Sequence, residues 1–349
     1  MLASGTLVAV KRLDLGVAAG GGGAAGLSMT DQMRTEVEVL SQVQHVNIVP
    51  LLGSSKDGIA PCLVYALMEG GSVQDRLACR GSGALVPLTA NERILVLSDI
   101  ARGLAYLHSE VRVIHRDVKS ANVLLDEGCR GRIGDFGIAK SLNDKSAGIT
   151  VTHMHTEHVM GTQVYMAPEY LKGKLSMKVD SFAFGLVILE TLTGLPVCNP
   201  AAEHCDLLEM FEEDLDTPTK LLAHLDKRAC WDQHNQERIG RLHSIAERCI
   251  EMHRKKRPEL VELIPELEEV RRGTEALQAP EAERAVGPLK AEAAEKECCI
   301  CLKAEEVGKL LALVPCGHRC VCAGCSALVV GHTCPVCRTE ARQAIRVFD

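Results

Sequence analysis

Chemistry-bearing side chains are concentrated at the C-terminal end of the chain. Nine of the 16 cysteines lie between Cys298 and Cys337. Seven of these cysteines and one histidine form the pairs Cys298-x2-Cys301, Cys316-x-His318, Cys322-x2-Cys325 and Cys334-x2-Cys337. A zinc ion takes four thiolate or imidazole ligands in tetrahedral geometry, so eight ligands suit two ions. The spacing therefore predicts that this segment binds two Zn2+.

Two cysteines of this cluster fall outside the ligand pairs. Cys299 and Cys320 each leave a single residue before the next cysteine, which is tighter than the usual zinc knuckle. We interpret both as cysteines that do not bind zinc. The seven other cysteines are scattered between Cys62 and Cys249 without repeated spacing, and we expect them to be small buried hydrophobes.

The elements that must position reactive residues are predicted from the hydrophobic pattern. Residues 1–272 alternate short apolar runs with helical patterns, 273–297 form a linker rich in Ala and Glu, and 298–349 form the cysteine-rich module. A small strand-rich piece followed by a large helical piece predicts an α+β fold of two lobes with a cleft between them. We expect strands at 6–10, 48–52 and 62–65 and helices at 31–42, 94–108 and 181–192.

Composition limits the classes of protein to which the chain can belong. It has 349 residues, and 39 basic against 46 acidic ones give a net charge of -7, which disfavours nucleic-acid binding. The apolar stretch at 182–189 is much shorter than the roughly 20 residues that a bilayer requires, so no membrane span is expected. The N-terminus has no basic region followed by a long apolar run, so we do not expect a secretory signal. The lack of a span and of a signal leaves the cytosol or the nucleus, and we expect a cytoplasmic protein.

A second set of reactive residues lies in the middle of the chain. The string His115-Arg116-Asp117-Val118-Lys119-Ser120-Ala121-Asn122 is followed by Asp135-Phe136-Gly137 and then by Ala167-Pro168-Glu169. Upstream lie Val8-Ala9-Val10-Lys11 and Glu36. In order and spacing, the first three segments resemble the catalytic loop, the metal-binding motif and the closing motif of protein kinases. Lys11 and Glu36 resemble the lysine of the third strand and the acidic residue of the partner helix. The resemblance implies a bilobal protein-kinase fold.

The resemblance also implies roles in phosphoryl transfer, which depends on positioning and charge neutralisation. Lys11, held by Glu36, is expected to contact the α- and β-phosphates of ATP. Asn122 and Asp135 are expected to bind Mg2+.

Two residues of the catalytic loop are the expected catalytic groups. Asp117 would accept or orient the proton of the substrate hydroxyl, and Lys119 would reach the γ-phosphate. A lysine at this position resembles Ser/Thr kinases, as does Thr162. Protein substrates are therefore expected partners.

The segment between the two lobes indicates a subgroup. Cys62-Leu63-Val64-Tyr65 and the run at 70–77 resemble the hinge of Pelle-like kinases, which include interleukin-receptor-associated and plant receptor-like kinases. The resemblance makes Tyr65 the gatekeeper of the adenine pocket and places Leu67 among the ATP-binding residues. It covers roughly residues 5–270.

Three further positions have architectural roles in this resemblance. Glu169 is expected to pair with Arg257, and Asp180 is expected to brace the backbone of the catalytic loop. Arg116 precedes the catalytic Asp, as in kinases whose activation segment is ordered by a phosphate. The candidate acceptors are Thr150, Thr152 and Thr156, and we interpret the nearby His153, His155 and His158 as part of a polar loop.

The chain departs from the family pattern before Lys11. Only ten residues precede this lysine, and they contain no Gly-rich phosphate loop. The glycines at 21–26 follow the lysine strand, where they cannot form the lid over the phosphates, and are expected to be a surface loop. The sequence is consistent with a truncated kinase or with a kinase-derived domain of poor ATP affinity. We favour truncation because the downstream catalytic residues are all in place.

The C-terminal ligand order, three Cys, one His and four Cys, resembles a RING finger of the inhibitor-of-apoptosis type. The resemblance implies interleaved sites, in which the first and third pairs share one zinc and the second and fourth share the other. It also implies contact with a ubiquitin-conjugating enzyme through Ile300, Pro335 and Arg338. The tail at 344–348 resembles segments that form RING homodimers. A zinc module that only binds a partner is the alternative.

The sequence thus predicts a Ser/Thr kinase domain lacking its Gly-rich loop, joined to a RING ubiquitin-ligase module. Its expected cofactors are ATP, Mg2+ and two Zn2+. The rival prediction is an ATP-poor kinase-fold scaffold that recruits substrates for RING-dependent ubiquitination.

Overall fold

The computed structural model describes residues 7–12, 29–55, 61–79, 86–144, 149–150, 153–156, 159–199, 206–232, 235–278, 295–297, 304–306, 311–314, 319–321 and 343–346. The chain divides into two compact units, Met1–Pro280 and Glu281–Asp349.

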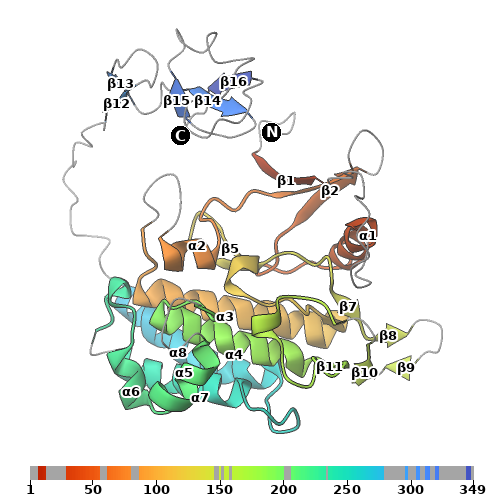
Figure 1. Ribbon diagram of the computed structural model, residues 1–349, viewed down its shortest axis with the longest axis vertical. Helices are drawn as coiled ribbons and strands as arrows, with labels where there is room; N and C mark the ends of the chain where they lie inside the picture. Colours follow the sequence, from red (N-terminus) through yellow and green to blue (C-terminus); the bar gives the residue numbers. More distant parts are fainter. Residues whose placement is uncertain are drawn as a thin grey trace. The chain divides into compact units, whose positions relative to one another are not determined.

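A small antiparallel sheet lies at the start of the first unit (Figure 1). Its strands β1 (Val8–Arg12), β2 (Leu51–Ser55) and β3 (Cys62–Ala66) follow the order β1-β3-β2. In β1, Ala9 pairs with Tyr65 and Lys11 with Leu63. Residues two apart point to the same face of a strand, so Ala9 and Lys11 share one side of the sheet. Helix α1 (Met29–Leu40) packs against this sheet through β2.

The sheet differs from expectation at its second strand. The strand predicted at 48–52 begins only at Leu51. Ile48 instead makes an isolated bridge to Ile133, and the Val49 N–H donates to the Ile133 carbonyl at 2.9 Å. The next residue is Pro50, which has no N–H to donate to a ladder. The segment therefore links the sheet to the helical lobe before its strand starts.

The rest of the first unit is mainly helical. In the described residues, seven α-helices follow the sheet: α2 (Val73–Ala78), α3 (Ala90–Tyr106), α4 (Lys178–Thr193), α5 (Leu207–Asp214), α6 (Pro218–Ala223), α7 (Gln236–Cys249) and α8 (Leu260–Gln278). Short strands connect them: β4 (Val113–Ile114), β5 (Val123–Leu125), β6 (Gly131–Ile133), β7 (Lys140–Ser141), β8 (Asn143–Asp144), β9 (Ile149–Thr150), β10 (His153–His155) and β11 (Lys174–Ser176). The α+β prediction is thereby confirmed.

Helix α3 is fixed at its start by a capping box. The Thr89 hydroxyl accepts from the Glu92 N–H, and the Glu92 carboxylate accepts from the Thr89 N–H at 2.8 Å. Two otherwise unpaired backbone donors are satisfied in this way. The helix predicted at 94–108 therefore begins earlier, and after Tyr106 it passes into a π-helical turn over Leu107–Val111.

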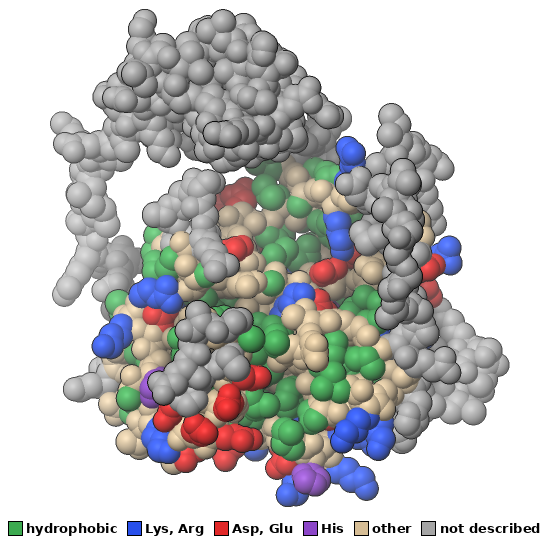
Figure 2. All heavy atoms as spheres, in the orientation of Figure 1, with side chains coloured by type: hydrophobic (Ala, Val, Ile, Leu, Met, Phe, Trp, Pro, Cys, Tyr) green, Lys and Arg blue, Asp and Glu red, His purple; other side chains and the backbone are tan. Residues whose placement is uncertain are grey.

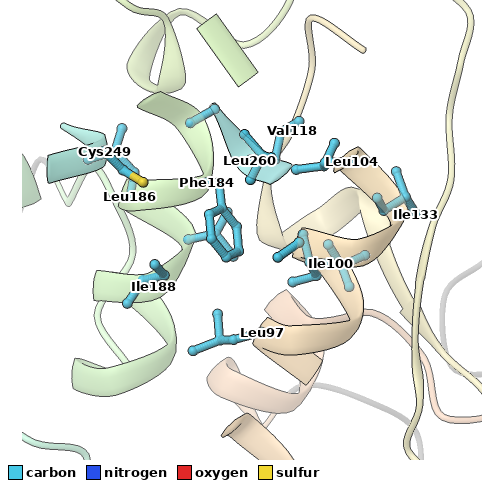
Figure 3. Close-up of a cluster of buried hydrophobic side chains, with 14 of the residues drawn as sticks. Leu97, Ile100, Leu104, Val118, Ile133, Phe184, Leu186, Ile188, Cys249 and Leu260 are labelled. Atoms are coloured by element: carbon cyan, nitrogen blue, oxygen red, sulfur yellow. The ribbon is translucent and has the colours of Figure 1, made fainter. Parts of the chain in front are cut away.

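The hydrophobic core lies between α3 and α4. Leu97, Ile100 and Leu104 of α3 and Phe184 and Ile188 of α4 belong to one buried cluster, shown in Figure 3. Helix α4 is buried nearly all round, as its continuous apolar sequence predicts.

Helix α4 approaches α7 closely at one glycine. A Cβ at Gly185 would lie 2.7 Å from the Cβ of Cys249, closer than two such atoms can pack. Only glycine therefore permits the two helices to meet at this point.

The second unit is described only through its strands. They form a two-stranded sheet and a three-stranded sheet of order β15-β14-β16. The strands are β12 (Glu295–Glu297), β13 (Ala304–Glu306), β14 (Leu311–Val314), β15 (Arg319–Val321) and β16 (Gln343–Arg346). Within the described parts of both units, no helix is long and apolar enough to cross a membrane.

Candidate active site

A cavity of about 270 Å3 lies between the sheet and the helical lobe. Apolar side chains supply its walls, among them Ala9 of β1, Val49 and Leu124 of β5. Its remaining lining residues are Lys11, Glu36, Tyr65, Ala66, Ala121, Asn122, Gly134 and Asp135. Leu67, predicted to bind ATP, is 39% exposed and is not among the lining residues. The cavity is thus lined by both apolar and charged side chains.

Lys11 joins the two lobes through contacts with two acidic lining residues. Its Nζ lies 2.9 Å from Oε2 of Glu36 and 2.7 Å from Oδ1 of Asp135. Burial lowers the pKa of Lys11, but the two carboxylates outweigh this effect and raise it. The ammonium is therefore charged at neutral pH. Glu36 is 1% exposed, and its Oε1 also accepts from the Phe136 N–H at 3.2 Å.

Asp117 lies at the centre of a four-donor network. Its Oδ1 accepts from the backbone N–H and the hydroxyl of Thr162, at 2.9 and 2.8 Å. Its Oδ2 accepts from Lys119 at 2.7 Å and from Asn122 at 2.9 Å. Burial would raise the pKa of Asp117, but these hydrogen bonds outweigh it and hold the pKa below its ordinary value. The carboxylate is consequently ionised and fixed in orientation.

Asp180, at the start of α4, braces the loop that carries Asp117. Its carboxylate accepts from the backbone N–H groups of His115 and Arg116, at 2.8 and 2.9 Å. The ring of His108 lies 2.7 Å from the same carboxylate. Arg116 has a φ of 72°, a left-handed conformation that is rare for residues other than glycine. The hydrogen bonds to Asp180 offset the energetic cost of this backbone conformation of Arg116. The sequence predicted that Asp180 braces the catalytic loop.

The Asp135 segment is attached to the same loop. Nε2 of His115 lies 3.1 Å from the Gly134 carbonyl, and its ring meets that of Phe136 edge-on with centroids 4.8 Å apart. Asp135 has a φ of 62°. The backbone thus turns sharply between Gly134 and Phe136, and the carboxylate of Asp135 reaches Lys11.

This geometry corresponds to a known family. The model of the protein kinase domain matches residues 2–266, about three quarters of the chain. The chain belongs to the protein kinase family. The C3HC4-type zinc finger, or RING finger, matches residues 294–344.

Several curated kinases are similar to this one. The Pelle-like serine/threonine-protein kinase pik-1 of Caenorhabditis elegans is 37% identical over 209 residues, which cover 59% of this chain and 42% of pik-1. The probable serine/threonine-protein kinase PBL28 of Arabidopsis thaliana is 33% identical over 276 residues, covering 76% of this chain and 69% of PBL28. The receptor protein kinase WSS1 of Oryza sativa subsp. japonica is 30% identical, and the chain spans 28% of its length.

Tyr65, the predicted gatekeeper, is one of the residues that line the cavity. This residue is buried, and its hydroxyl has no hydrogen-bond partner among the described residues. Burial and the nearby Glu36 carboxylate raise its pKa, so the phenol is neutral. Tyr65 thus lies in the cavity wall near Glu36, the residue that holds Lys11.

Asn122 and Asp135 are chemically suited to a magnesium ion. The Nδ2 of Asn122 donates to both the backbone carbonyl and the side chain of Asp117, at 2.9 Å each. This orientation leaves the amide oxygen available as a ligand. The Asp135 side chain is 47% exposed, although it contacts Lys11. A carboxylate and an amide oxygen are ligands that Mg2+ prefers.

The activation segment is anchored at its C-terminal end. Arg257 is fully buried and forms a two-point pair with Glu169, at 2.8 and 3.2 Å. Its guanidinium also stacks 4.9 Å from the ring centroid of Phe182. The predicted pairing of Glu169 with Arg257 is present.

Several predicted positions lie outside the described residues. They comprise all eight zinc ligands, the three residues expected to contact a conjugating enzyme, Thr152, His158 and the glycines at 21–26. For Thr150, His153 and His155 the structure describes only the backbone strands. Among the described residues there is no group of three or more His, Cys, Asp or Glu side chains suited to hold a metal ion.

Some residues that line the cavity or support the catalytic loop were not found from the sequence. Val49 and Leu124 line the nucleotide cavity, and Tyr170 contacts Arg116. The two apolar residues lie within ordinary hydrophobic runs, which carry no signal for a binding site. Tyr170 directly follows the Ala-Pro-Glu motif, and its role depends on a contact that spacing does not reveal.

Proposed function

We propose that the chain is a protein serine/threonine kinase that transfers the γ-phosphate of ATP to protein hydroxyls. The observation that carries the proposal is the convergence of Lys119 and Thr162 on an ionised, oriented Asp117. Asp117 orients the substrate hydroxyl and accepts its proton, and Lys119 is close enough to share the charge of the transferred group. Lys11 holds the nucleotide phosphates, and Asn122 and Asp135 would hold Mg2+. Bound Mg2+ neutralises phosphate charge.

The kinase proposal is tested by replacing Asp117 in the 349-residue chain. With saturating Mg2+ and ATP, Asp117→Asn should reduce phosphorylation of a serine- and threonine-containing protein by at least about 100-fold, because the general base is lost. Asp126→Asn is the matched control, since Asp126 pairs with Arg132 outside the cleft. Equal activity in the Asp117 variant, or product found on tyrosine alone, contradicts the proposal.

We propose that the RING finger gives the chain ubiquitin-ligase activity. The support is the match to a C3HC4-type finger, together with the residue types of Ile300, Pro335 and Arg338. A RING positions a charged conjugating enzyme and forms no covalent intermediate. Ile300→Ala and Arg338→Ala should therefore slow ubiquitin discharge while zinc content is unchanged, and Thr339→Ala should leave discharge intact. Normal discharge by both variants would show that the surface is wrongly assigned.

The alternative function is a scaffold whose kinase fold binds ATP poorly. The 349 residues contain no Gly-rich segment before Lys11. Such a loop contributes backbone N–H donors to the phosphates, so this chain is expected to bind ATP weakly through the hinge and charged residues alone. Calorimetry with Mg2+ and ATP distinguishes the functions. Binding too weak to detect, with no phosphorylation but normal ubiquitin discharge, supports the scaffold.

We propose that the protein is located in the cytoplasm. Zinc thiolates must stay reduced, which fits a reducing compartment.

We propose that the RING forms homodimers. β16 lies at the edge of its sheet, and an edge strand can pair with another chain. Ile345→Pro removes one N–H donor from this strand and should lower the mass measured by light scattering from dimer to monomer. A monomer mass for the wild-type chain contradicts the dimer, and an unchanged dimer mass in the variant contradicts the assignment of β16 as the interface.

A further inference from the structure

A second cavity, of about 380 Å3, lies where α1 ends and the chain continues toward β2. We call it the α1–β2 cavity. Leu40, the last residue of α1, lines it together with Ile48 and Val49, and all three are buried. Ser41 and Gln44 also line it and are exposed, so the cavity is open to solvent. A volume of this size is sufficient for a small organic molecule.

The α1–β2 cavity shares a lining residue with the nucleotide cavity. Val49 lines both cavities, and its N–H donates to the Ile133 carbonyl at 2.9 Å. Leu40 lies about one helical turn after Glu36, which lines the nucleotide cavity and holds Lys11. A molecule in the α1–β2 cavity would therefore contact the end of the helix that carries Glu36 and one wall residue of the nucleotide cavity.

The two cavities differ in charge. Lys11, Glu36 and Asp135 line the nucleotide cavity, and Figure 2 shows charged side chains beside hydrophobic ones between the sheet and the helical lobe. Among the described residues that line the α1–β2 cavity, none is Lys, Arg, Asp or Glu. Burying an ion without a partner of opposite charge is costly, so this cavity favours an uncharged ligand.

His45, which lines the α1–β2 cavity, has a free ring N–H. Its Nδ1 accepts from the Asn47 N–H at 3.1 Å, so the proton of the neutral ring is on Nε2. Burial and the nearby Arg102 lower the pKa of His45, which keeps the ring neutral at pH 7. The ring is stacked on that of Tyr106, with centroids 4.8 Å apart. Within the described part of the chain Nε2 has no hydrogen-bond partner, and a carbonyl oxygen could accept from it.

We propose that the α1–β2 cavity binds an uncharged molecule with an apolar ring and a carbonyl group, and that this molecule stabilises the wall of the nucleotide cavity. The ring packs against Leu40, Val43 and Leu51, which line the cavity. The carbonyl accepts from Nε2 of His45. Contact with Val49 holds its hydrogen bond to the helical lobe. The site does not depend on the proposed kinase chemistry.

The probe for this site is N-phenylacetamide, which has one phenyl ring, one carbonyl group and no charge. In NMR titrations of the 349-residue chain it should bind saturably with a Kd of about 1 mM or tighter, as expected for about ten non-hydrogen atoms. Phenylacetate has the same ring and a negative charge, and it should bind at least about tenfold more weakly. Equal affinities for the two compounds, or no saturable binding of N-phenylacetamide, overturn the proposal.

A filling substitution tests where the probe binds. Ser41→Trp places an indole in the same space and should weaken binding of N-phenylacetamide at least about tenfold. Gln42→Trp is the matched control and should leave the affinity within about twofold, because an exposed residue outside the lining adds no bulk to the cavity. The side chains of both residues donate to the Glu38 carbonyl, so the two variants lose the same hydrogen bond. Wild-type affinity in a folded Ser41→Trp chain would show that the probe binds elsewhere and overturn the site.

A second variant keeps the test decisive if Ser41→Trp is poorly folded. His45→Phe retains a ring that can stack on Tyr106 but removes the Nε2 donor. It should weaken binding of N-phenylacetamide about fivefold, as expected for one neutral hydrogen bond. An unchanged affinity would contradict the role of His45.

Amide exchange tests the link to the nucleotide cavity without catalysis or bound ATP. Saturating N-phenylacetamide should slow exchange about threefold or more at the Val49 N–H and at the Phe136 N–H, which donates to Glu36. The Leu207 N–H of α5, which donates to the Val197 carbonyl, should be unaffected. Probe binding without slower exchange at Val49 and Phe136 overturns the stabilising role. If the chain phosphorylates no protein but binds the probe as expected, the kinase function fails and this site stands.

Discussion

Arg116 and Tyr170 are joined by a hydrogen bond of 2.8 Å from Nε to the phenol oxygen, although 54 residues separate them. The same phenol donates to the Met160 carbonyl at 3.0 Å and accepts from the Met160 N–H at 3.1 Å. One side chain therefore ties the residue before Asp117 to the activation segment.

Removing the Tyr170 hydroxyl should loosen this connection. Tyr170 is 1% exposed, so Tyr170→Phe leaves buried polar groups without their partner and should lower the free energy of unfolding by about 1–3 kcal/mol. Amide exchange at Met160 should accelerate. Tyr106→Phe is the control, because the Tyr106 hydroxyl accepts only a 3.4 Å contact from the exposed Gln44 N–H. Equal exchange at Met160 in both variants would show that the phenol does not hold the segment.

The buried pair of Glu169 and Arg257 should contribute more to stability than an exposed pair. Glu169→Ala leaves a fully buried guanidinium uncompensated, so unfolding in denaturant should show a loss of about 3–5 kcal/mol. Glu266→Ala removes a partly exposed pair with Arg248 and should cost about 0–1 kcal/mol. Losses of similar size in the two variants would contradict this prediction.

Glu190 should make the stability of the kinase unit depend on pH. Because burial raises its folded-state pKa to about 7 from an ordinary value of 4.5, the folded state retains a proton that the unfolded state releases. This contribution is fully present below pH 4.5 and is lost as pH rises through 7, by about 3 kcal/mol.

Glu190→Gln provides the reference for that pH dependence, because the glutamine does not titrate. The groups facing Glu190 are the hydroxyls of Ser120 and Tyr165 and the guanidinium of Arg228, and none of them titrates between pH 4.5 and 7. In denaturant titrations, the wild type should therefore lose stability relative to Glu190→Gln between pH 5 and pH 8. A constant difference across this range would show that the carboxyl has an ordinary pKa.

Residues 298–337 should bind two zinc ions per chain and unfold when zinc is removed. The module at 298–349 has 52 residues and few aromatic side chains, so it buries too little apolar surface to fold alone and metal binding must supply the free energy. Chelation should abolish its folded NMR signals. Cys298→Ser and Cys334→Ser should lose zinc, whereas Cys299→Ser and Cys320→Ser should keep it. One zinc per chain, or loss of zinc on changing Cys320, would show that the ligand set is wrong.

Much of the site was predictable because its residues are grouped along the chain. Asp117, Lys119 and Asn122 lie within six residues, and their mutual contacts follow from one short loop. The loop's dependence on Asp180 was also expected from the resemblance. The start of β2 was not, because the hydrophobic run at 48–52 does not reveal that Val49 bonds to Ile133 instead of a neighbouring strand.

The sequence by itself determined the family, the α+β class and the identity of the charged residues, because these depend on residue types at fixed spacing. Only the tertiary structure decided which groups are left unsatisfied. Glu190 is one acid within an apolar helical run, and its buried Oε2 has no hydrogen-bond donor within the described part of the chain. Burial and the absence of a partner arise from segments far apart in the chain, so periodicity and spacing carry no trace of them.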